Sequence, residues 1–277
     1  MEAPLCLPHL YAPFLHILWY IYSLRVLCIF LLRFAEKYCI MSVIDPVACH
    51  YRKEEGTYML SKILMTAMEL IGTVAFAVSG SLVAISCSLD LFGVLIIGCI
   101  TAVGGGIMRD ILIQNLPPNI FSNLGVLALA VLTSLVVFCI AYIKRKSFVE
   151  LKEKIDHINN IFDALGLAAF SVTGVGVAVS SAHGDNIVLA VTLGMLTGVG
   201  GGVLRDVLVN EKPYILTKHI YAVASILGSI LYYAVSVYMN RQVLGAILAY
   251  FVTVAIRLLA AKYHWNLPKI RFTDGKK

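Results

Sequence analysis

The sequence predicts an all-α polytopic membrane protein made of two similar three-helix units and a seventh helix. Three observations support this fold class. The 277 residues are 60% hydrophobic and only 14% charged, whereas soluble domains carry about 25% charged residues. Seven apolar segments after residue 60 have the length of a membrane span. An internal repeat relates the first three of these segments to the next three.

The expected spans follow from length and hydropathy. A helix needs about 20 mainly apolar residues to cross about 30 Å of hydrocarbon. The segments that qualify are 65–85, 91–115, 121–143, 161–181, 187–209, 219–239 and 243–261. The connections are short except for "KRKSFVELKEKIDHINN", which we expect to be a linker. The chain therefore divides into a first repeat, a linker, a second repeat, and a last helix with a basic tail. Their ranges are 60–143, 144–160, 161–239 and 240–277.

The extension at residues 1–58 has two open interpretations. Its segment "YAPFLHILWYIYSLRVLCIFLLRF" is long enough to span, although Arg25 would cost about 2.5–3.5 kcal/mol at the centre of a bilayer. It lacks the basic start and the small-residue cleavage site of a signal peptide. It forms either an eighth helix or a segment upstream of a later start of translation. The candidate starts are Met41, Met59 and Met65.

The basic residues outside the spans predict the orientation, because cytoplasmic loops carry an excess of Lys and Arg. One side holds most of them: Lys144, Arg145, Lys146, Lys152, Lys154, Lys212, Lys218, Lys262, Lys269, Arg271, Lys276 and Lys277. The other side holds Arg52, Lys53, Lys62 and Arg241. We therefore expect a cytoplasmic tail, with the start of the first span outside.

The repeat is clearest in two pairs of segments. "TAVGGGIMRDILIQNLPP" at 101–118 and "TGVGGGVLRDVLVNEKPY" at 197–214 share Thr, Val, Gly-Gly-Gly, Arg-Asp, Leu and Pro in register. "MELIGTVAFAVSGSLVA" from 68 likewise matches "FDALGLAAFSVTGVGVA" from 162. Because each unit holds an odd number of spans, the second enters the membrane from the opposite face, which makes the repeat inverted. In transporters of this kind the solute site lies near the midplane, where corresponding interrupted helices meet.

The glycine triplets are the candidate pore or solute-binding residues. They are Gly104, Gly105, Gly106, Gly200, Gly201 and Gly202. Successive glycines weaken a helix by about 1 kcal/mol each relative to alanine and leave one turn without side chains. Such a turn either lets a neighbouring helix pack closely or opens, so that carbonyls line a water-filled path. Because two triplets are related by the repeat, the pattern favours a pore or site.

Charged residues lie one turn beyond each triplet, where burial in a membrane requires a partner or water. They are Arg109, Asp110, Arg205 and Asp206. Candidate partners at matching depth are Glu69 and Asp163, so the sequence predicts two pairs, Glu69 with Arg109 and Asp163 with Arg205. The pairs are either structural clamps or gates. Arg257, in the last span, either reaches Asp206 or snorkels to the surface, and the pattern favours snorkelling.

Several classes of function are excluded. The Rossmann fingerprint needs a sixth-position glycine, but "GGGIMR" and "GGGVLR" place Arg109 and Arg205 there. Seven cysteines form no C-x-x-C pair, and no set of nucleophile, base and orienting residue appears. The basic residues flank apolar segments, which is typical of a membrane protein rather than a nucleic-acid binder. We therefore expect no enzyme activity, cofactor, metal site or nucleic-acid partner.

At these residues the sequence resembles the bacterial branch of the trimeric intracellular cation (TRIC) channel family, which overlaps a family catalogued as putative glycine transporters. The doubled "GGGxxRD" motif within residues 60–262 carries the resemblance. The resemblance implies a homotrimer in the bacterial inner membrane, in which each subunit has its own pore, kinked at the triplets. It also implies an external amino terminus and a cytoplasmic tail. The extension at 1–58 departs from the family pattern.

Two classes of function remain open at this stage. A channel for monovalent cations, chiefly potassium, would use the carbonyls of the open turns. A carrier for glycine or a similar small amino acid would hold a carboxylate at half-helix amino termini and alternate access. A purely structural membrane scaffold is disfavoured by the duplicated triplets and charges.

Overall fold

The structure is a computed structural model that describes residues 54–144, 152–181, 184–217 and 220–263. Within these ranges the chain forms helices and no strands. The prediction of an eighth helix, and nearly all of the extension at 1–58, lie outside the described residues, as does most of the basic tail.

Seven of the described helices are long and apolar enough to cross a membrane, as the hydropathy pattern predicts. In the first half these are α2 (Glu54–Ser86), α3 (Leu91–Leu112) and α5 (Leu124–Ile143), with a short α4 (Asn119–Ser122) before α5. In the second half they are α7 (Lys152–Ser180), α8 (Ile187–Leu208) and α10 (Ile220–Tyr233), with a short α9 (Tyr214–Thr217) before α10. A π-helical turn, η1 (Ala234–Tyr238), continues α10, and α11 (Gln242–Lys262) follows.

The largest boundary errors concern the polar helix starts. The expected linker at 144–160 is partly helical, because α7 begins at Lys152. Likewise, α2 begins at Glu54, eleven residues before the expected span. The polar first turns of these helices lie outside any apolar window, so hydropathy alone does not detect them.

The third span is also shorter than expected. The residues at its predicted start belong to α4, and α5 begins only at Leu124. Two residues after the last residue of α3 and of α8 the chain has a residue at positive φ, Gln114 (φ 57°) and Asn210 (φ 60°). A left-handed residue of this kind commonly terminates a helix. The proline-containing segments that follow lead into the short helices α4 and α9.

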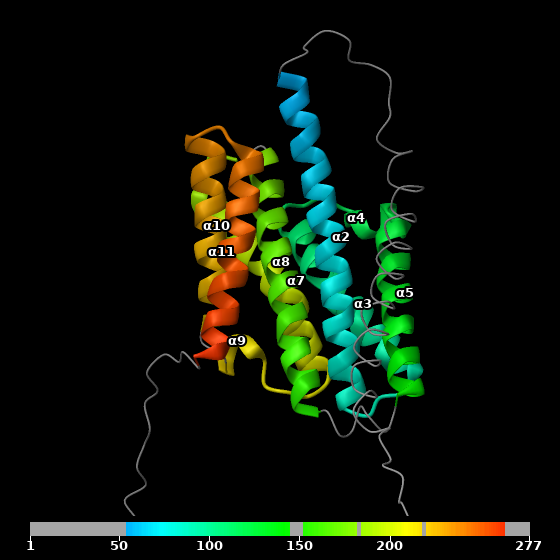
Figure 1. Ribbon diagram of the computed structural model, residues 1–277. Coiled ribbons are helices and arrows are strands. Elements are labelled where there is room, and N and C mark those ends of the chain that lie inside the picture. Colours follow the sequence, from blue (N-terminus) through cyan, green and yellow to red (C-terminus); the bar gives the residue numbers. More distant parts are fainter. Residues whose placement is uncertain (1–53, 145–151, 182–183, 218–219, 264–277) are drawn as a thin grey trace, which may run out of the picture. The chain divides into compact units, whose positions relative to one another are not determined.

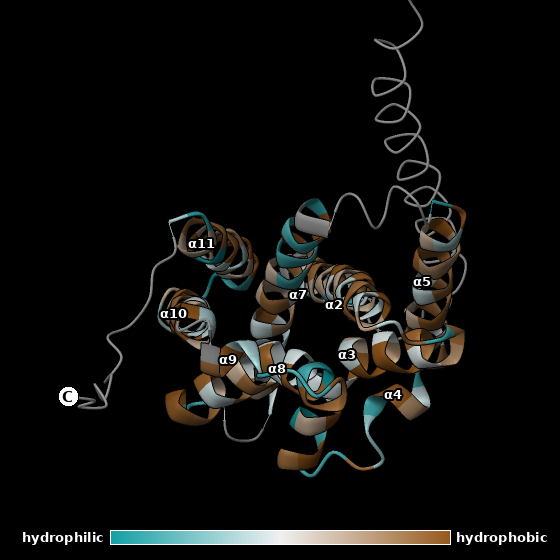
Figure 2. Cartoon of the chain, turned by 90° about the horizontal axis from the view of Figure 1, so that it is seen from below, coloured by the Kyte–Doolittle hydropathy of each residue, from teal (hydrophilic) through white to brown (hydrophobic). Residues whose placement is uncertain are grey.

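The two halves repeat the same packing. α2 packs against α7, and α3 packs against α8, in the middle of the molecule (Figure 1). α5 packs on α2 and α3, and α10 correspondingly packs on α7 and α8 (Figure 2). α11 breaks this correspondence because it packs mainly on α7 and α10 of the second half. Large apolar side chains are exposed on the outer helices, for example Leu135, Leu227 and Phe251, which is typical of a lipid-facing surface.

Small residues set the close approach of α2 to α7. The ring of Phe170 on α7 lies against Gly72 on α2, where a β-carbon would be 3.1 Å from the ring. The ring of Phe76 on α2 lies in the same way against Gly166 on α7. The two rings also meet each other, with centroids 5.3 Å apart. Packing of small residues against larger ones is a general means of joining helices in membranes.

Candidate functional site

Buried charged residues gather in two places, one in each half. We call the group formed by Asp163, Arg205, Asp206 and Arg257 the second-half cluster. We call the cavity beside Glu69, Arg109 and Asp110 the first-half pocket. Each contains the Arg-Asp pair of its own repeat and an acidic residue from the middle part of the preceding long helix, Glu69 on α2 or Asp163 on α7.

Arg205 is the centre of the second-half cluster. Its Nη1 lies 2.9 Å from Asp163 Oδ1 and donates a hydrogen bond of 2.6 Å to Ser79 Oγ, while its Nε lies 2.8 Å from Asp206 Oδ1. Arg205 and Asp163 are both 0% exposed. The predicted pair between Asp163 and Arg205 is therefore confirmed. A buried charge is tolerated only when it is paired and hydrogen-bonded, as it is here.

The cluster joins residues that are distant in the sequence. Ser79 on α2 donates a hydrogen bond of 2.7 Å to Asn159 Oδ1 on α7. The ring of Tyr214 lies 5.2 Å below the Arg205 guanidinium carbon, and Tyr221 Oη lies 3.4 Å from Asp163 Oδ1. The sequence analysis missed Ser79 and Asn159, because Asn159 falls in the expected linker and a serine within an apolar span carries no distinctive signal.

Arg257 also belongs to this cluster, so the prediction that it snorkels is wrong. It is 2% exposed, and its Nη2 lies 3.6 Å from Asp163 Oδ2 and 3.2 Å from Asn160 Oδ1. Its guanidinium carbon lies 4.6 Å from the centre of the Tyr221 ring. It thus reaches Asp163 rather than Asp206. Its place in a buried stripe with four-residue spacing could have revealed this. That stripe is Gly245, Ala249, Thr253 and Arg257.

In the first half, Arg109 binds its own neighbour instead of the predicted partner. Its Nε lies 2.8 Å from Asp110 Oδ1, and among the described residues no ion pair within 4.0 Å joins it to Glu69. The predicted pair of Glu69 with Arg109 is therefore not formed as a direct ion pair, although both residues line the same pocket. Adjacent helix residues do not normally face each other, but the long arginine side chain folds back far enough to reach the next carboxylate.

The aspartates of the two motifs have a second role that the sequence analysis missed. Asp110 Oδ2 accepts a hydrogen bond of 2.9 Å from the backbone N–H of Asn119, the first residue of α4. Asp206 Oδ2 accepts a bond of the same length from the N–H of Tyr214, the first residue of α9. Each aspartate therefore fixes an arginine with one oxygen and the start of a short helix with the other. This satisfies a backbone donor that a helix start leaves without an intrahelical partner.

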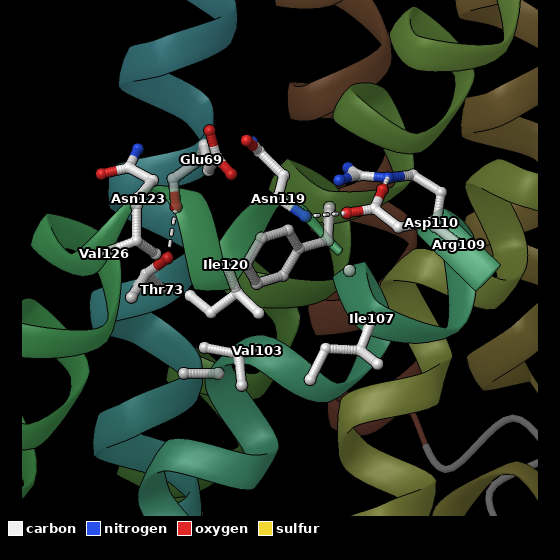
Figure 3. Close-up of a pocket in the computed structure, with 13 residues that line it drawn as sticks. Glu69, Thr73, Val103, Ile107, Arg109, Asp110, Asn119, Ile120, Asn123 and Val126 are labelled. Atoms are coloured by element: carbon white, nitrogen blue, oxygen red, sulfur yellow. Dashed lines mark hydrogen bonds and ion pairs between the residues drawn. The ribbon is translucent and has the colours of Figure 1, made fainter. Parts of the chain in front are cut away.

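The first-half pocket is a small cavity between α2, α3 and the segment around α4 (Figure 3). Its volume is about 30 Å³, which has room for about two water molecules. Its lining residues are Glu69, Thr73, Ala102, Val103, Gly106, Ile107, Arg109, Asp110, Asn119, Ile120, Asn123, Val126 and Phe170. Two carboxylates and one guanidinium line it, so a cation would balance the pocket when both carboxylates are ionised. Within the described ranges, no group of three or more His, Cys, Asp or Glu could hold a metal ion.

The glycine triplets lie where α3 crosses α8. Both helices continue through their triplets without interruption, so the expected opening of the helix is not present in this structure. A β-carbon on Gly105 would collide with the carbonyl oxygen of Thr197, and one on Gly201 would collide with that of Thr101. Reciprocal contacts of this kind are what a two-fold axis between the halves would produce. The middle glycines therefore allow the two backbones to touch.

The third glycine of each triplet has a different environment. A β-carbon on Gly106 would have only Arg109 Nη2 within 4 Å, at 3.9 Å, because this glycine borders the pocket. A β-carbon on Gly202 would lie 3.0 Å from Tyr221 Oη and 3.7 Å from Arg205 Nη2. Each triplet thus presents its first two glycines to the opposite helix and its third to the charges of its own half.

Phe76 and Phe170 separate the two charged sites. On α2, Phe76 lies between Glu69 of the pocket and Ser79 of the second-half cluster, two positions about 15 Å apart along a helix. On α7, Phe170 follows Asp163 by two turns and lines the pocket. Both belong to an apolar group that also contains Ala102, Leu167 and Val199. We call this group the apolar layer.

Comparison with known proteins identifies the family. A family model described as glycine transporter matches residues 66–142 and 160–237, which together hold most of the two three-helix units. The inner membrane protein YadS of Escherichia coli is 36% identical over 217 residues, which are 77% of this chain and 99% of YadS. The membrane protein YvgT of Bacillus subtilis is 34% identical over 205 residues, 74% of this chain and 96% of YvgT.

Solved structures are also similar. A prokaryotic TRIC channel crystallised in 0.5 M KCl has a TM-score of 0.65 and 38% identity, covering 76% of this chain and all of that one. The chain belongs to the bacterial TRIC family. The trimeric intracellular cation channel orthologue from Rhodobacter sphaeroides has the same TM-score, with 26% identity over 73% of this chain and 98% of that one. The range matched by the family model ends at residue 237, before α11 and Arg257.

Proposed function

We propose that this TRIC protein is a monovalent cation channel, with potassium as its main ion, in the bacterial inner membrane. The path would run through each subunit from the first-half pocket, past the apolar layer, to the second-half cluster. The observation that carries this proposal is the difference between the two halves: corresponding charged residues border a cavity in one half and are sealed in the other.

The chemistry of the pocket supports a cation as the permeant species. Glu69 makes no ion pair within 4.0 Å among the described residues, so its carboxylate is free to attract a cation. The side chains of Asn119 and Asn123 also line the cavity, and amide oxygens can replace part of an ion's hydration shell. Arg109 would repel a cation, but Asp110 holds its guanidinium at 2.8 Å and offsets its charge.

Two barriers indicate that this conformation is closed. The apolar layer consists mainly of apolar side chains, and narrow apolar constrictions exclude water. Beyond it, Arg205 is fully buried and fixed by Asp163, Ser79 and Asp206. Conduction would therefore require both barriers to rearrange, and the ion pairs would act as a gate as well as a structural clamp.

In this function the glycine triplets would form the contact at which α3 and α8 move against each other. Gly105 and Gly201 bring the backbones of α3 and α8 together, while Gly106 and Gly202 border the two charged sites. A small rotation of α3 against α8 would change which groups face the path. In this proposal Gly106 and Gly202 line the path, whereas Gly105 and Gly201 keep the backbones of α3 and α8 in contact.

We further propose a homotrimer in which each subunit carries its own path, by analogy with the trimeric orthologue. The distribution of basic residues supports a cytoplasmic tail, in which case the first-half pocket would face outside and the second-half cluster inside.

A glycine carrier of the same fold is the second candidate, supported by the description of the matching family model. The cavity of about 30 Å³ suits water molecules or a partly hydrated ion better than an amino acid. The experiment that separates the two measures potassium efflux and uptake of labelled glycine by the purified protein in the same liposomes. Potassium efflux without saturable glycine uptake supports the channel. Saturable glycine uptake without potassium efflux supports the carrier and rejects the channel.

A further inference from the structure

We propose that Arg257 is a tethered cation: its guanidinium fills a cation site at Asp163 and keeps the path closed until it leaves. This inference rests on the proposed cation conduction. It names Arg257 as the residue that blocks the path and Asp163 as the site that a permeating monovalent cation would occupy after Arg257 leaves.

The charge balance of the two halves differs by one cation. The second-half cluster holds two carboxylates, Asp163 and Asp206, and two guanidiniums, Arg205 and Arg257. The first-half pocket holds two carboxylates and one guanidinium. The extra cation of the second half comes from α11, the one long described helix that has no counterpart in the other repeat. Arg257 thus supplies, from outside the repeat, the charge that a mobile cation would supply in the pocket.

The groups that contact Arg257 are ones that attract cations of many kinds. Arg257 faces a carboxylate oxygen at 3.6 Å, an amide oxygen of Asn160 at 3.2 Å and the ring of Tyr221 at 4.6 Å. Carboxylates, amide oxygens and aromatic faces attract cations in general and are not specific for a guanidinium. A potassium ion could therefore use the same groups.

Arg257 is held less firmly than Arg205. Arg205 donates hydrogen bonds to Asp163, Asp206 and Ser79, at 2.6 to 2.9 Å. By contrast, within the described part of the chain Arg257 donates one hydrogen bond, to Asn160 Oδ1 at 3.2 Å, and its contact with Asp163 Oδ2 is longer, at 3.6 Å. Asp163 Oδ2, Arg257 Nε and Arg205 Nη2 are all buried without a hydrogen-bond partner among the described residues. Buried charged atoms that lack hydrogen bonds favour an alternative arrangement. Arg257 is therefore the cation of this cluster that can leave with the smaller loss of contacts.

The first test measures potassium flux in liposomes for Arg257→Met, which keeps the approximate length of the side chain but removes its charge. We expect flux per folded protein to rise about tenfold, which lies within the usual range for energetic coupling between two sites. Arg257→Lys keeps the charge and should stay near the wild-type flux. Arg241→Ala, at the exposed start of the same helix, is the matched control and should change nothing. Gel filtration and thermal unfolding establish that each variant is folded.

The second test replaces the lost group in Arg257→Ala with free guanidinium ion at millimolar concentration. Guanidinium should reduce the raised flux and increase the unfolding temperature of this variant but not of the wild type, whereas urea, its neutral isostere, should do neither. Unchanged flux in Arg257→Met, or no selective effect of guanidinium on Arg257→Ala, would overturn the tethered cation. If no variant conducts, but guanidinium still stabilises Arg257→Ala selectively, the channel proposal fails while the cation site at Asp163 stands.

Discussion

Gly105 and Gly201 stand in a reciprocal relationship across the crossing of α3 and α8. A β-carbon on either glycine would meet the carbonyl oxygen of the threonine that lies four residues before the other. Backbone carbonyls cannot move aside as a flexible side chain can. The middle glycines are therefore required by close packing, whatever further role their triplets have in conduction.

This relationship predicts different effects for adjacent glycines. Gly105→Ala and Gly201→Ala should each lower the free energy of unfolding by about 1–3 kcal/mol, the usual effect of overpacking. Gly106→Ala is the matched control, because its new methyl group would enter the border of the pocket. Thermal unfolding of the purified variants in detergent would measure the difference. Equal stability of Gly105→Ala and Gly106→Ala would contradict the packing role.

The two acidic residues of the repeat should differ in their structural importance. Asp163→Asn removes the carboxylate that faces Arg205 and Arg257, and breaking a buried pair costs about 3–5 kcal/mol. Glu69→Gln should cost about 1 kcal/mol or less, because Glu69 makes no ion pair within 4.0 Å among the described residues. The same unfolding measurement compares the two, and similar losses for both variants would argue against the asymmetry between the halves.

Asp110 should control the order of the short helix α4. In Asp110→Ala the N–H of Asn119 loses its hydrogen-bond acceptor. Loss of such a cap usually destabilises a helix by about 1 kcal/mol, so amide exchange in α4 should become about fivefold faster. Hydrogen exchange with mass spectrometry over residues 119–122 would detect this change. Asp90→Ala provides the control, since Asp90 accepts a bond from the N–H of Gly93 at the start of α3. The effect of Asp90→Ala should be confined to α3. If residues 119–122 exchange at the wild-type rate in Asp110→Ala, Asp110 does not control the order of α4.

The apolar layer should limit potassium flux in the closed state. Phe170→Ser places a hydroxyl beside the pocket and opens space next to Phe76, so water can enter the layer and flux should rise. Phe170→Leu keeps the site apolar and should leave flux near the wild-type level. Liposome flux, normalised to folded protein, compares the two variants. Equal flux for serine and leucine would show that the layer does not limit conduction.

The sequence predicts the class of fold and the number of spans because both depend on the length and hydropathy of continuous segments. It also identifies the charged motifs, since buried Arg and Asp are rare in membrane helices. What it misses depends on distances between helices. Arg109 folds back onto Asp110, and Arg257 turns inward because its side of α11 packs on the second half. The triplets remain helical because the opposite helix occupies the space that their missing side chains leave.

The central claim is that the path selects cations, and the reversal potential tests it most directly. Purified protein would be reconstituted in a bilayer with a potassium chloride gradient, and the current of the wild type and of Glu69→Gln would be recorded. We expect a wild-type reversal potential close to the equilibrium potential of potassium, and a value shifted toward that of chloride in Glu69→Gln. A wild-type reversal potential near that of chloride, or no current from protein that takes up glycine saturably, would contradict it.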